Sequence, residues 1–328
     1  MSLSEETLRE MYWIMLLSRK LDERAWILHR QGKIAFHISA IGHEAAQIGM
    51  AYAIHRGEDW VAPYYRDLTL MLALGMTARD FMLGLMGKQG EPTSGARQMP
   101  SHWSIKSMNV ISHSSPVATQ TTHAAGIGLA IKLKGDKKVV LTTIGEGATS
   151  QGEWYEGVNW AAVHKLPVLF IVENNIYAIS VRQEQQMATE TVADKAKGLG
   201  LPGITVDGND FIKVHGVVKQ AVDRAREGEG PTLIETKTYR ITPHSSDDDD
   251  RTYRPREEVE ESKKRDPILL AKNFLRKEGI LTEDLIEDME EKAKSEVNDA
   301  VKFAESTPYP DPGEASTPVY AEGDEPCL

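Results

Sequence analysis

Short runs of apolar, β-branched residues alternate with stretches of helical periodicity through the middle of the chain. Residues 139–144 and 168–172 are two such runs, and they predict buried strands. Between them, Trp154, Val158 and Ala161 recur at intervals of three and four residues, which indicates a helix. Strand, helix and strand in this order predict a βαβ unit with parallel strands and a right-handed crossover.

The alternation of strands and helices extends to both sides of this unit. The pattern predicts further helices over residues 3–30, within 37–54, twice between 68 and 86, after residue 120, and over 212–227, 266–277 and 282–305, with strands beginning at Gly203 and over 232–241. Such an order favours an α/β fold, with a doubly wound, mostly parallel sheet and helices on both faces. We expect an α/β domain over residues 1–260 and a C-terminal helical extension and tail over residues 261–328.

Four stretches of the chain lack a clear period. Residues 88–115 form a long loop that contains glycine, serine and proline, and loops of this length are often functional. Residues 247–250 are four aspartates and predict a solvated, mobile segment. The highly charged residues 254–265 are interpreted as a linker, and the tail from Thr307 onwards is expected to be extended.

Composition narrows the classes of function. The 328 residues are 41% apolar, enough for a sizeable core, yet no apolar run approaches the roughly 20 residues of a membrane span. A net charge of −11 disfavours nucleic acid and anionic membranes as partners. The single cysteine, Cys327, excludes a disulfide framework within one chain. The N-terminus has neither a signal peptide nor a transit peptide pattern, so the cytoplasm of a prokaryote is the expected location.

Polar side chains follow both strands of the central unit. Glu146 follows the first strand, inside a Gly-Glu-Gly turn, and Asn175 follows the second. The carboxyl ends of parallel strands meet at one edge of a sheet, where open α/β sheets bind their ligands. A helix N-terminus at that edge favours phosphate, and a carboxylate with an amide oxygen suits magnesium. The pair therefore predicts a magnesium site that bridges to phosphates.

These residues also carry a resemblance to a known superfamily. The Gly145-Glu146-Gly147 turn, 26 further residues and then Asn174-Asn175 resemble the diphosphate and magnesium motif of thiamine-diphosphate enzymes. Within that superfamily the chain resembles the alpha subunit of the decarboxylating component of a 2-oxo acid dehydrogenase, most closely the branched-chain type. The nicotinamide fingerprint is absent, because Ser150 stands where Gly-x-Gly-x-x-Gly requires its third glycine.

The resemblance implies a thiamine-diphosphate-binding fold and a set of cofactor residues. Magnesium would be held by Glu146, Asn175 and the backbone carbonyl of Tyr177. Thiamine diphosphate would meet, besides these, the residues Tyr65, Arg66, Ser115, Val117, Gly147, Ala148, Ile179 and His244. In branched-chain members a potassium ion is held by the serine, threonine and glutamine that match Ser114, Thr119 and Gln120.

Three residues are candidates for catalysis on the same basis. His244 matches the histidine that lies over the thiazolium ring, and an imidazole is suited to exchanging protons near neutral pH. His102, in Arg-Gln-Met-Pro-Ser-His, matches a histidine near the substrate, and Ser115 belongs to the Ser-Ser-Pro run. For His113 a structural role is as well supported as a catalytic one. Ser245 matches a serine that is phosphorylated in animal relatives.

Substrate and partners follow from the resemblance as well. The family uses a separate beta chain in a tetramer of two alpha and two beta chains, and passes the acyl group to a lipoyl-bearing acyltransferase. The Arg-Gln-Met-Pro motif favours branched-chain 2-oxo acids, whereas Glu173 suits pyruvate or acetoin enzymes equally well. Since a glutamate would repel diphosphate, Glu173 is expected to point away from it. The alternative of another class is a non-catalytic subunit that binds a phosphorylated ligand.

Overall fold

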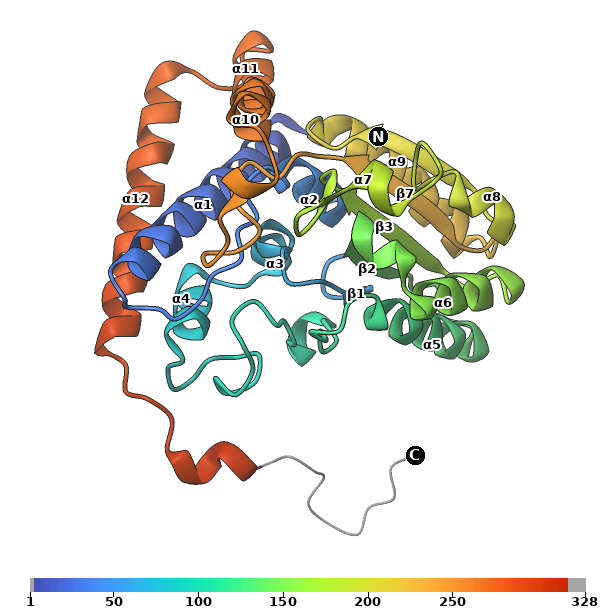
Figure 1. Cartoon of the computed structure of the whole chain (residues 1–328), viewed down its shortest axis with the longest axis horizontal. Helices are drawn as coiled ribbons and strands as arrows, with labels where there is room; N and C mark the ends of the chain where they lie inside the picture. Colours follow the sequence, from blue (N-terminus) through green and yellow to red (C-terminus); the bar gives the residue numbers. More distant parts are fainter. Residues whose placement is uncertain (1–2, 318–328) are drawn as a thin grey trace.

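A five-stranded parallel sheet forms the centre of the molecule (Figure 1). The structure, a computed structural model, describes residues 3–317. The strands are β1 (Trp60–Ala62), β2 (Val140–Gly145), β3 (Val168–Asn174), β6 (Gly203–Asp207) and β7 (Thr232–Lys237). Their order is β1-β2-β3-β7-β6, and every neighbouring pair is parallel. The predicted α/β class with a parallel sheet is confirmed.

Helices cover both faces of this sheet. They are α1 (Glu5–Arg30), α2 (Glu44–Ala51), α3 (Leu68–Leu74), α4 (Ala78–Met86), α5 (Thr119–Lys134), α6 (Gly152–Val163), α7 (Gln183–Gln186), α8 (Lys195–Leu199), α9 (Phe211–Arg226), α10 (Arg256–Lys263), α11 (Pro267–Lys277) and α12 (Glu283–Ser306). Successive side chains of β3 point to opposite faces, as a strand requires. Leu169 and Ile171 pack in the core formed with α1, α2 and α9, and Val168 and Phe170 in the core formed with α5 and α6.

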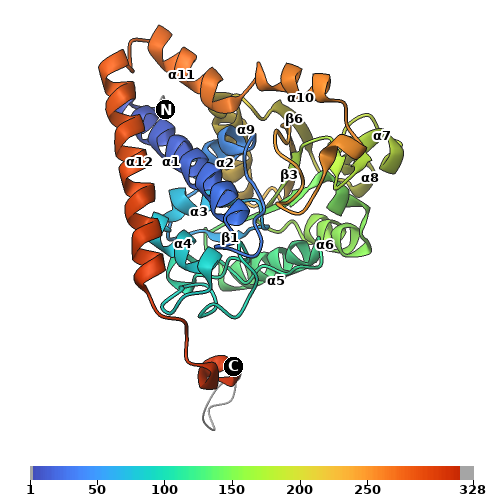
Figure 2. The same ribbon diagram turned by 60° about the vertical axis from the view of Figure 1, so that its left-hand side comes forward.

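The C-terminal helices lie against the N-terminal one. Figure 2 shows α12 running beside α1, and buried residues of α11 and α12 belong to the same hydrophobic core as α1 and α4. None of the helices formed by residues 3–317 has the length and apolar character needed to cross a membrane.

Two small β elements were missed by the sequence patterns. Strand β1 has only three residues, too few for a period to emerge, yet it pairs with β2 from Trp60 opposite Val140. A hairpin of β4 (Tyr177–Ala178) and β5 (Val181–Arg182) follows β3. The predicted strand over 232–241 is too long, because β7 ends at Lys237. Thr238 still donates a backbone hydrogen bond to Asn174, and the next residue, Tyr239, lies with its carbonyl against Gly42 instead of continuing the sheet.

The expected linker over 254–265 is wrong, since it contains α10. Acidic residues in its first turn and Lys263 in its last complement the helix dipole, so charge alone did not mark a linker. Its Glu258 accepts hydrogen bonds from the hydroxyls of Tyr177 and Tyr239, at 3.0 and 2.9 Å. Hydrogen bonds from side chains that are distant in sequence thus hold this helix against the rest of the protein.

The aspartate loop and the tail are more structured than expected. Asp248 accepts from the backbone N–H of His244 at 2.8 Å, and Asp250 pairs with Arg254, whereas Asp247 and Asp249 are exposed as predicted. The tail is extended after α12 but forms a short 3₁₀ helix, η4 (Pro312–Ser316). Cys327 lies outside the described residues.

Candidate active site

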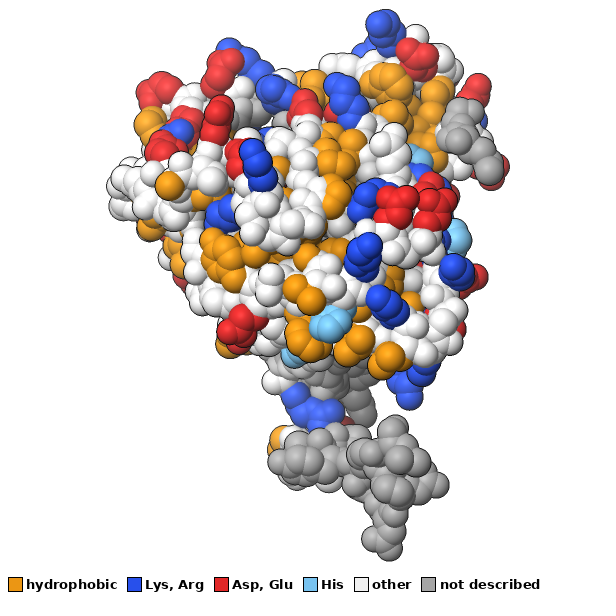
Figure 3. Space-filling view, turned by 90° about the vertical axis from the view of Figure 1, so that its right-hand side faces the viewer, with side chains coloured by type: hydrophobic (Ala, Val, Ile, Leu, Met, Phe, Trp, Pro, Cys, Tyr) orange, Lys and Arg blue, Asp and Glu red, His pale blue; other side chains and the backbone are white. Residues whose placement is uncertain are grey.

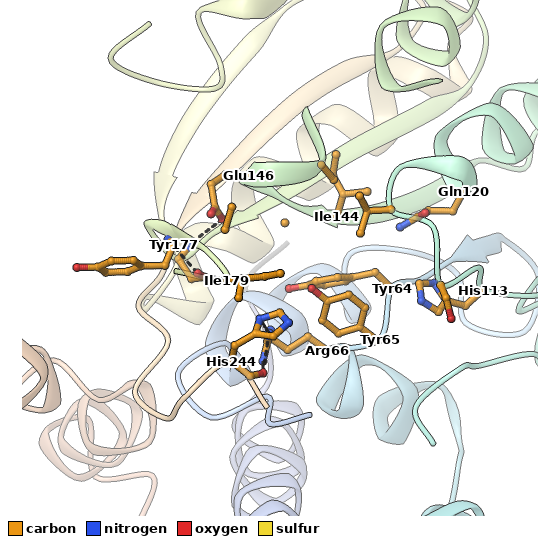
Figure 4. A pocket seen from close by; sticks show the side chains of 17 residues that line it. Tyr64, Tyr65, Arg66, His113, Gln120, Ile144, Glu146, Tyr177, Ile179 and His244 are labelled. Carbon is orange, nitrogen blue, oxygen red and sulfur yellow. Dashed lines mark hydrogen bonds between the residues drawn. The ribbon is translucent and has the colours of Figure 1, made fainter. Parts of the chain in front are cut away.

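A cavity of about 380 Å³ lies at the carboxyl ends of β2 and β3 (Figure 4), within the range of roughly 300–1,000 Å³ usual for ligand sites. The predicted residues that line it are Tyr65, Arg66, Ser115, Val117, Gln120, Glu146, Gly147, Ala148, Asn175, Tyr177, Ile179 and His244. The structure thus brings together residues from five separate segments of the chain. Its other lining residues are Tyr64, His113, Ile144, Gly145 and Ala178.

Glu146 has a buried carboxylate in which only one of the two oxygens accepts a hydrogen bond within the described structure. It directly follows β2, and its Oε2 accepts from the backbone N–H of Asn175 at 3.3 Å. Its Oε1 is buried and has no hydrogen-bond partner in the described structure. Burial raises the pKa of Glu146. An unpaired carboxylate oxygen in such a place is costly, and a bound cation would offset that cost.

The turn after β3 carries the other predicted magnesium ligands. Oδ1 of Asn175 accepts from the backbone N–H of Tyr177 at 3.2 Å, which closes a tight turn. Ile176 and Ile179, on either side of it, have φ values of +77° and +56°. A β-branched residue rarely adopts this conformation, so the turn is strained, and such strain is typical of functional sites.

The donor set fits magnesium. It contains one carboxylate, one amide oxygen and one carbonyl, all hard oxygen ligands. Among residues 3–317 no group of three or more histidine, cysteine, aspartate or glutamate side chains is arranged for a metal. The absence of a side chain at Gly147 lets β4 pack closely against this segment, because a Cβ there would lie 2.6 Å from the Cβ of Ala178.

Two arginines contact the ring of His244, and Arg66 is the one drawn beside it in Figure 4. Nη2 of Arg66 lies 3.4 Å and Nη1 of Arg240 lies 3.3 Å from Nδ1 of His244. Arginine only donates, so Nδ1 accepts, and we infer that Nε2 carries the hydrogen. Burial and then the two arginines lower the pKa of His244 to about 3. The ring is therefore neutral at physiological pH and offers Nε2–H as a donor.

Arg240 was missed by the sequence analysis. It is fully buried and donates to the backbone carbonyl of Ile179 at 2.7 Å and, at a long 3.5 Å, to that of Tyr177. It therefore links the strained turn to His244. No local motif marks it, because its partners lie about 60 residues away in the chain.

The long loop places His102 next to the cavity, outside its lining and hydrogen-bonded to Ser115. Nδ1 of His102 lies 3.1 Å from the carbonyl of Pro100, and its Nε2 lies 2.5 Å from Oγ of Ser115. Since the carbonyl only accepts, Nδ1 donates and Nε2 accepts from the Ser115 hydroxyl. Ser115 lines the cavity and His102 does not, so His102 is connected to the cavity lining by its hydrogen bond to Ser115.

The chain is similar to known proteins over nearly its whole length. Residues 12–313 match the family model described as "Dehydrogenase E1 component". The chain belongs to this family. It is 50% identical over 322 residues to the 2-oxoisovalerate dehydrogenase subunit alpha of Bacillus subtilis, with 98% of each chain covered. It is also 39% identical over 306 residues to the pyruvate dehydrogenase E1 component subunit alpha of Staphylococcus aureus, covering 93% of this chain and 80% of the relative.

The resemblance stated from the sequence, to a dehydrogenase E1 alpha subunit nearest the branched-chain type, is confirmed by these matches. In this E1 component Glu173 lies outside the cavity lining, as its charge led us to expect. It accepts from Nε2 of Gln47 at 3.0 Å and from the hydroxyl of Tyr64 at 3.2 Å. Burial, followed by the neighbouring Asp67 carboxylate, raises the pKa of Glu173 well above its ordinary value.

The predicted potassium ligands of the E1 chain differ in whether their side-chain oxygens already form hydrogen bonds. The hydroxyl of Thr119 donates to Glu153 at 3.1 Å, while Ser114 is half-buried and does not line the cavity. Nε2 of Gln120 donates to the carbonyl of Thr143 at 3.0 Å, and its buried Oε1 has no hydrogen-bond partner in the described structure. A neutral oxygen of this kind suits potassium, and Gln120 supports the predicted ion more than Thr119 does.

Proposed function

We propose that this chain is the alpha subunit of a thiamine-diphosphate-dependent branched-chain 2-oxo acid dehydrogenase. The assembled enzyme decarboxylates the 2-oxo acid oxidatively and transfers the acyl group to a lipoyl-bearing acyltransferase. The observation that carries the site is the unpaired, buried Oε1 of Glu146 beside Asn175 at the sheet edge. The substrate class is supported by the 50% identity to a 2-oxoisovalerate dehydrogenase alpha subunit.

The cofactor, when bound, supplies the ylid and the electron sink for loss of carbon dioxide. Magnesium would be held by Glu146, Asn175 and the carbonyl of Tyr177, with Gly147 and Ala148 facing the diphosphate through their backbones. Tyr65 and Arg66, Ser115 and Val117, and Ile179 complete the cofactor contacts, and Ser114, Thr119 and Gln120 are the proposed potassium ligands. The thiamine-diphosphate-binding fold and the division of the chain near residue 260 belong to the same proposal.

His244 and Ser115 would handle protons and orientation at the reacting end. The neutral His244 donates from Nε2 and has its Nδ1 held by Arg66 and Arg240. Ser115 is oriented by its hydrogen bond to His102. Because both side chains are held by neighbours, they are pre-organised, which lowers the cost of orienting them during the reaction.

A beta chain would complete the site. Thiamine enzymes use a glutamate to activate the aminopyrimidine, and the family places it on the beta chain in a tetramer of two alpha and two beta chains. Ile179 lines the cavity yet remains 58% exposed, so the cavity is open on one side. The face formed by α5 and α6 carries further exposed apolar side chains (Figure 3), namely Leu133, Tyr155, Trp160 and Val163. Such a surface is typical of a subunit contact.

The test is calorimetric titration of thiamine diphosphate with magnesium, on this chain alone and after co-expression with its beta chain. We expect binding only in the pair. Asn175→Ala should weaken this binding by more than about 100-fold, because a metal ligand is lost, whereas Asn273→Ala, exposed on α11, should leave it unchanged. Retained magnesium-dependent binding in Asn175→Ala would refute the site.

A second candidate is a pyruvate or acetoin dehydrogenase alpha subunit. Glu173 suits such an enzyme equally well, and the Staphylococcus aureus pyruvate dehydrogenase relative is 39% identical. Comparing turnover of branched and linear substrates by the assembled enzyme separates the two. Full activity of a His244→Ala complex would instead favour a non-catalytic subunit that binds a phosphorylated ligand.

A further inference from the structure

His113, which lines the cavity, carries a hydrogen-bond acceptor that no described residue uses. Its ring is buried, and its Nδ1 lies 3.1 Å from the backbone carbonyl of Pro63. Because a carbonyl only accepts, Nδ1 of the neutral ring carries the hydrogen and Nε2 keeps its lone pair. Nε2 is buried and has no hydrogen-bond partner among the described residues, although His113 lines the cavity. This nitrogen can therefore accept a hydrogen bond from a ligand or a water molecule.

The ring is held firmly in this orientation. Tyr65 meets it edge-on with ring centroids 6.0 Å apart, and the ring of His102 lies 4.9 Å away on centroids. Its backbone N–H also donates to the carbonyl of Trp103 at 2.9 Å. With the bond to Pro63, these contacts leave the imidazole little freedom to turn.

His113 lies at the far end of the cavity from the proposed metal site. In Figure 4, Glu146 and Tyr177 lie at one end, His113 lies at the other, and the ring of Tyr65 stands between them. If the diphosphate occupies the Glu146 end, the acyl chain of the substrate extends toward His113. This step rests on the proposed function.

A buried acceptor at that end discriminates between acyl chains. An aliphatic group pressed against Nε2 removes its water without replacing the hydrogen bond, and such a loss weakens binding by roughly 5- to 150-fold. A chain with a terminal hydroxyl donates to Nε2, and a short chain leaves space for a bridging water. We propose that His113 is a specificity-determining residue that selects against long, wholly aliphatic acyl chains.

The test compares two substrates of equal length, 2-oxohexanoate and 5-hydroxy-2-oxopentanoate. The first ends in a methyl group and the second carries a hydroxyl group in its place. The assembled alpha–beta enzyme should prefer the hydroxyl compound in kcat/KM. His113→Phe keeps an aromatic ring between Tyr65 and His102 but removes the acceptor, so it should shift this preference toward the methyl compound by about tenfold or more. His113→Gln keeps an acceptor at similar reach and should retain most of the preference.

Two controls separate specificity from general damage. The preference is a ratio, so a loss of stability common to both substrates cancels, and His113→Leu serves as a second acceptor-free variant if the phenylalanine does not fit. His55→Gln changes an exposed histidine outside the cavity lining and should leave the ratio at its wild-type value. Calorimetry with the corresponding 2-hydroxy acids, which cannot lose carbon dioxide, should show the same shift in the ratio of Kd values.

The outcomes distinguish this inference from the proposed function. An unchanged ratio in His113→Phe and His113→Leu, with turnover retained, would overturn the role of His113. Failure of the wild-type complex to turn over any 2-oxo acid would overturn the proposed function instead.

Discussion

Nδ2 of Asn175 donates a hydrogen bond to Nε2 of His43 at 3.2 Å. Burial, and then the charge of Arg66, lower the pKa of His43 well below its ordinary value, so the ring stays neutral and can accept. With its NH₂ group held by His43, the amide of Asn175 must turn Oδ1 the other way, toward the backbone of Tyr177. His43 thereby orients the oxygen that is proposed to bind magnesium.

The first prediction concerns His43. His43→Phe removes the acceptor, so the amide of Asn175 is free to flip, and magnesium-dependent binding of thiamine diphosphate should weaken by about 10- to 100-fold, the usual effect of losing a residue that orients a metal ligand. His43→Gln keeps an acceptor and should lose less. Calorimetric titration of the assembled enzyme measures both. Equal affinities for His43→Phe and the wild type would contradict the orienting role.

The second prediction concerns the space beside Gly147. In Gly147→Ala the new Cβ would lie 2.6 Å from the Cβ of Ala178, which is bonded directly to the β4 backbone and has no rotamer that moves it aside. The β4 turn must shift, and overpacking of this kind costs about 1–3 kcal/mol of unfolding free energy. Cofactor affinity should fall as well, because the turn carries Tyr177.

Gly216 offers a matched control for this substitution. It lies inside α9, and a Cβ there meets no atom within 4 Å. Gly216→Ala should therefore stabilise the protein by about 0.5–1 kcal/mol through its better helix propensity. Chemical denaturation of both variants checks the opposite signs. A Gly147→Ala variant as stable as wild type would show that β4 yields easily.

The part of the site that follows the strands was predictable from the sequence. Glu146 and Asn175 directly follow two buried apolar runs, and parallel pairing places the ends of these strands at one edge whatever the rest of the chain does. The long helices could also be predicted from local sequence, because their apolar stripe repeats many times. Strand β1 has three residues and offers no such repetition.

The residues that orient the site could not be found in this way. His43 and Arg240 act on the turn after β3 from 132 and about 60 residues away in the sequence, and neither stands in a pattern that differs from an ordinary buried side chain. Glu258 reaches Tyr177 from a stretch whose dense charge suggested a solvated linker. Only the tertiary structure shows which single charge in such a stretch is satisfied internally.

The third prediction concerns Arg240. Arg240→Leu removes the donor to the carbonyl of Ile179 and one of the two donors to Nδ1 of His244, the other being Arg66. Activity of the assembled enzyme should fall by roughly 10- to 100-fold, because a hydrogen bond to a charged group contributes about 1.5–3 kcal/mol. Arg240→Lys keeps the charge but lacks the fork that reaches both groups, so it should restore little.

The control for Arg240 is a neighbour in the same loop. Arg251 pairs with Asp249 at the surface, and its side chain is 84% exposed, so Arg251→Leu should leave activity near the wild-type value. Steady-state turnover of all three variants, with cofactor titration, makes the comparison. Wild-type turnover in Arg240→Leu would mean that His244 and the turn after β3 are held by other contacts.

The fourth prediction concerns pH. Burial lowers the pKa of His113 to about 4 and that of His244 to about 3, whereas both rings titrate near 6.5 in the unfolded chain. Below about pH 6.5 the unfolded state therefore binds protons that the folded state does not. The stability from these neutral rings is complete above this pH and is lost as pH falls toward 4, by up to about 1.4 kcal/mol per pH unit for each ring.

Asp67 opposes this trend over part of the range. Burial raises its pKa to about 6, from an ordinary pKa near 4 in the unfolded chain. Between about pH 4 and pH 6 the folded state therefore binds a proton at Asp67 that the unfolded state does not. His244→Gln removes one titrating ring, so the loss of unfolding free energy between pH 6.5 and pH 4 should be smaller than in the wild type. Urea denaturation of the assembled enzyme across this range measures the difference, and parallel curves for the two proteins would mean that His244 is protonated in the folded state.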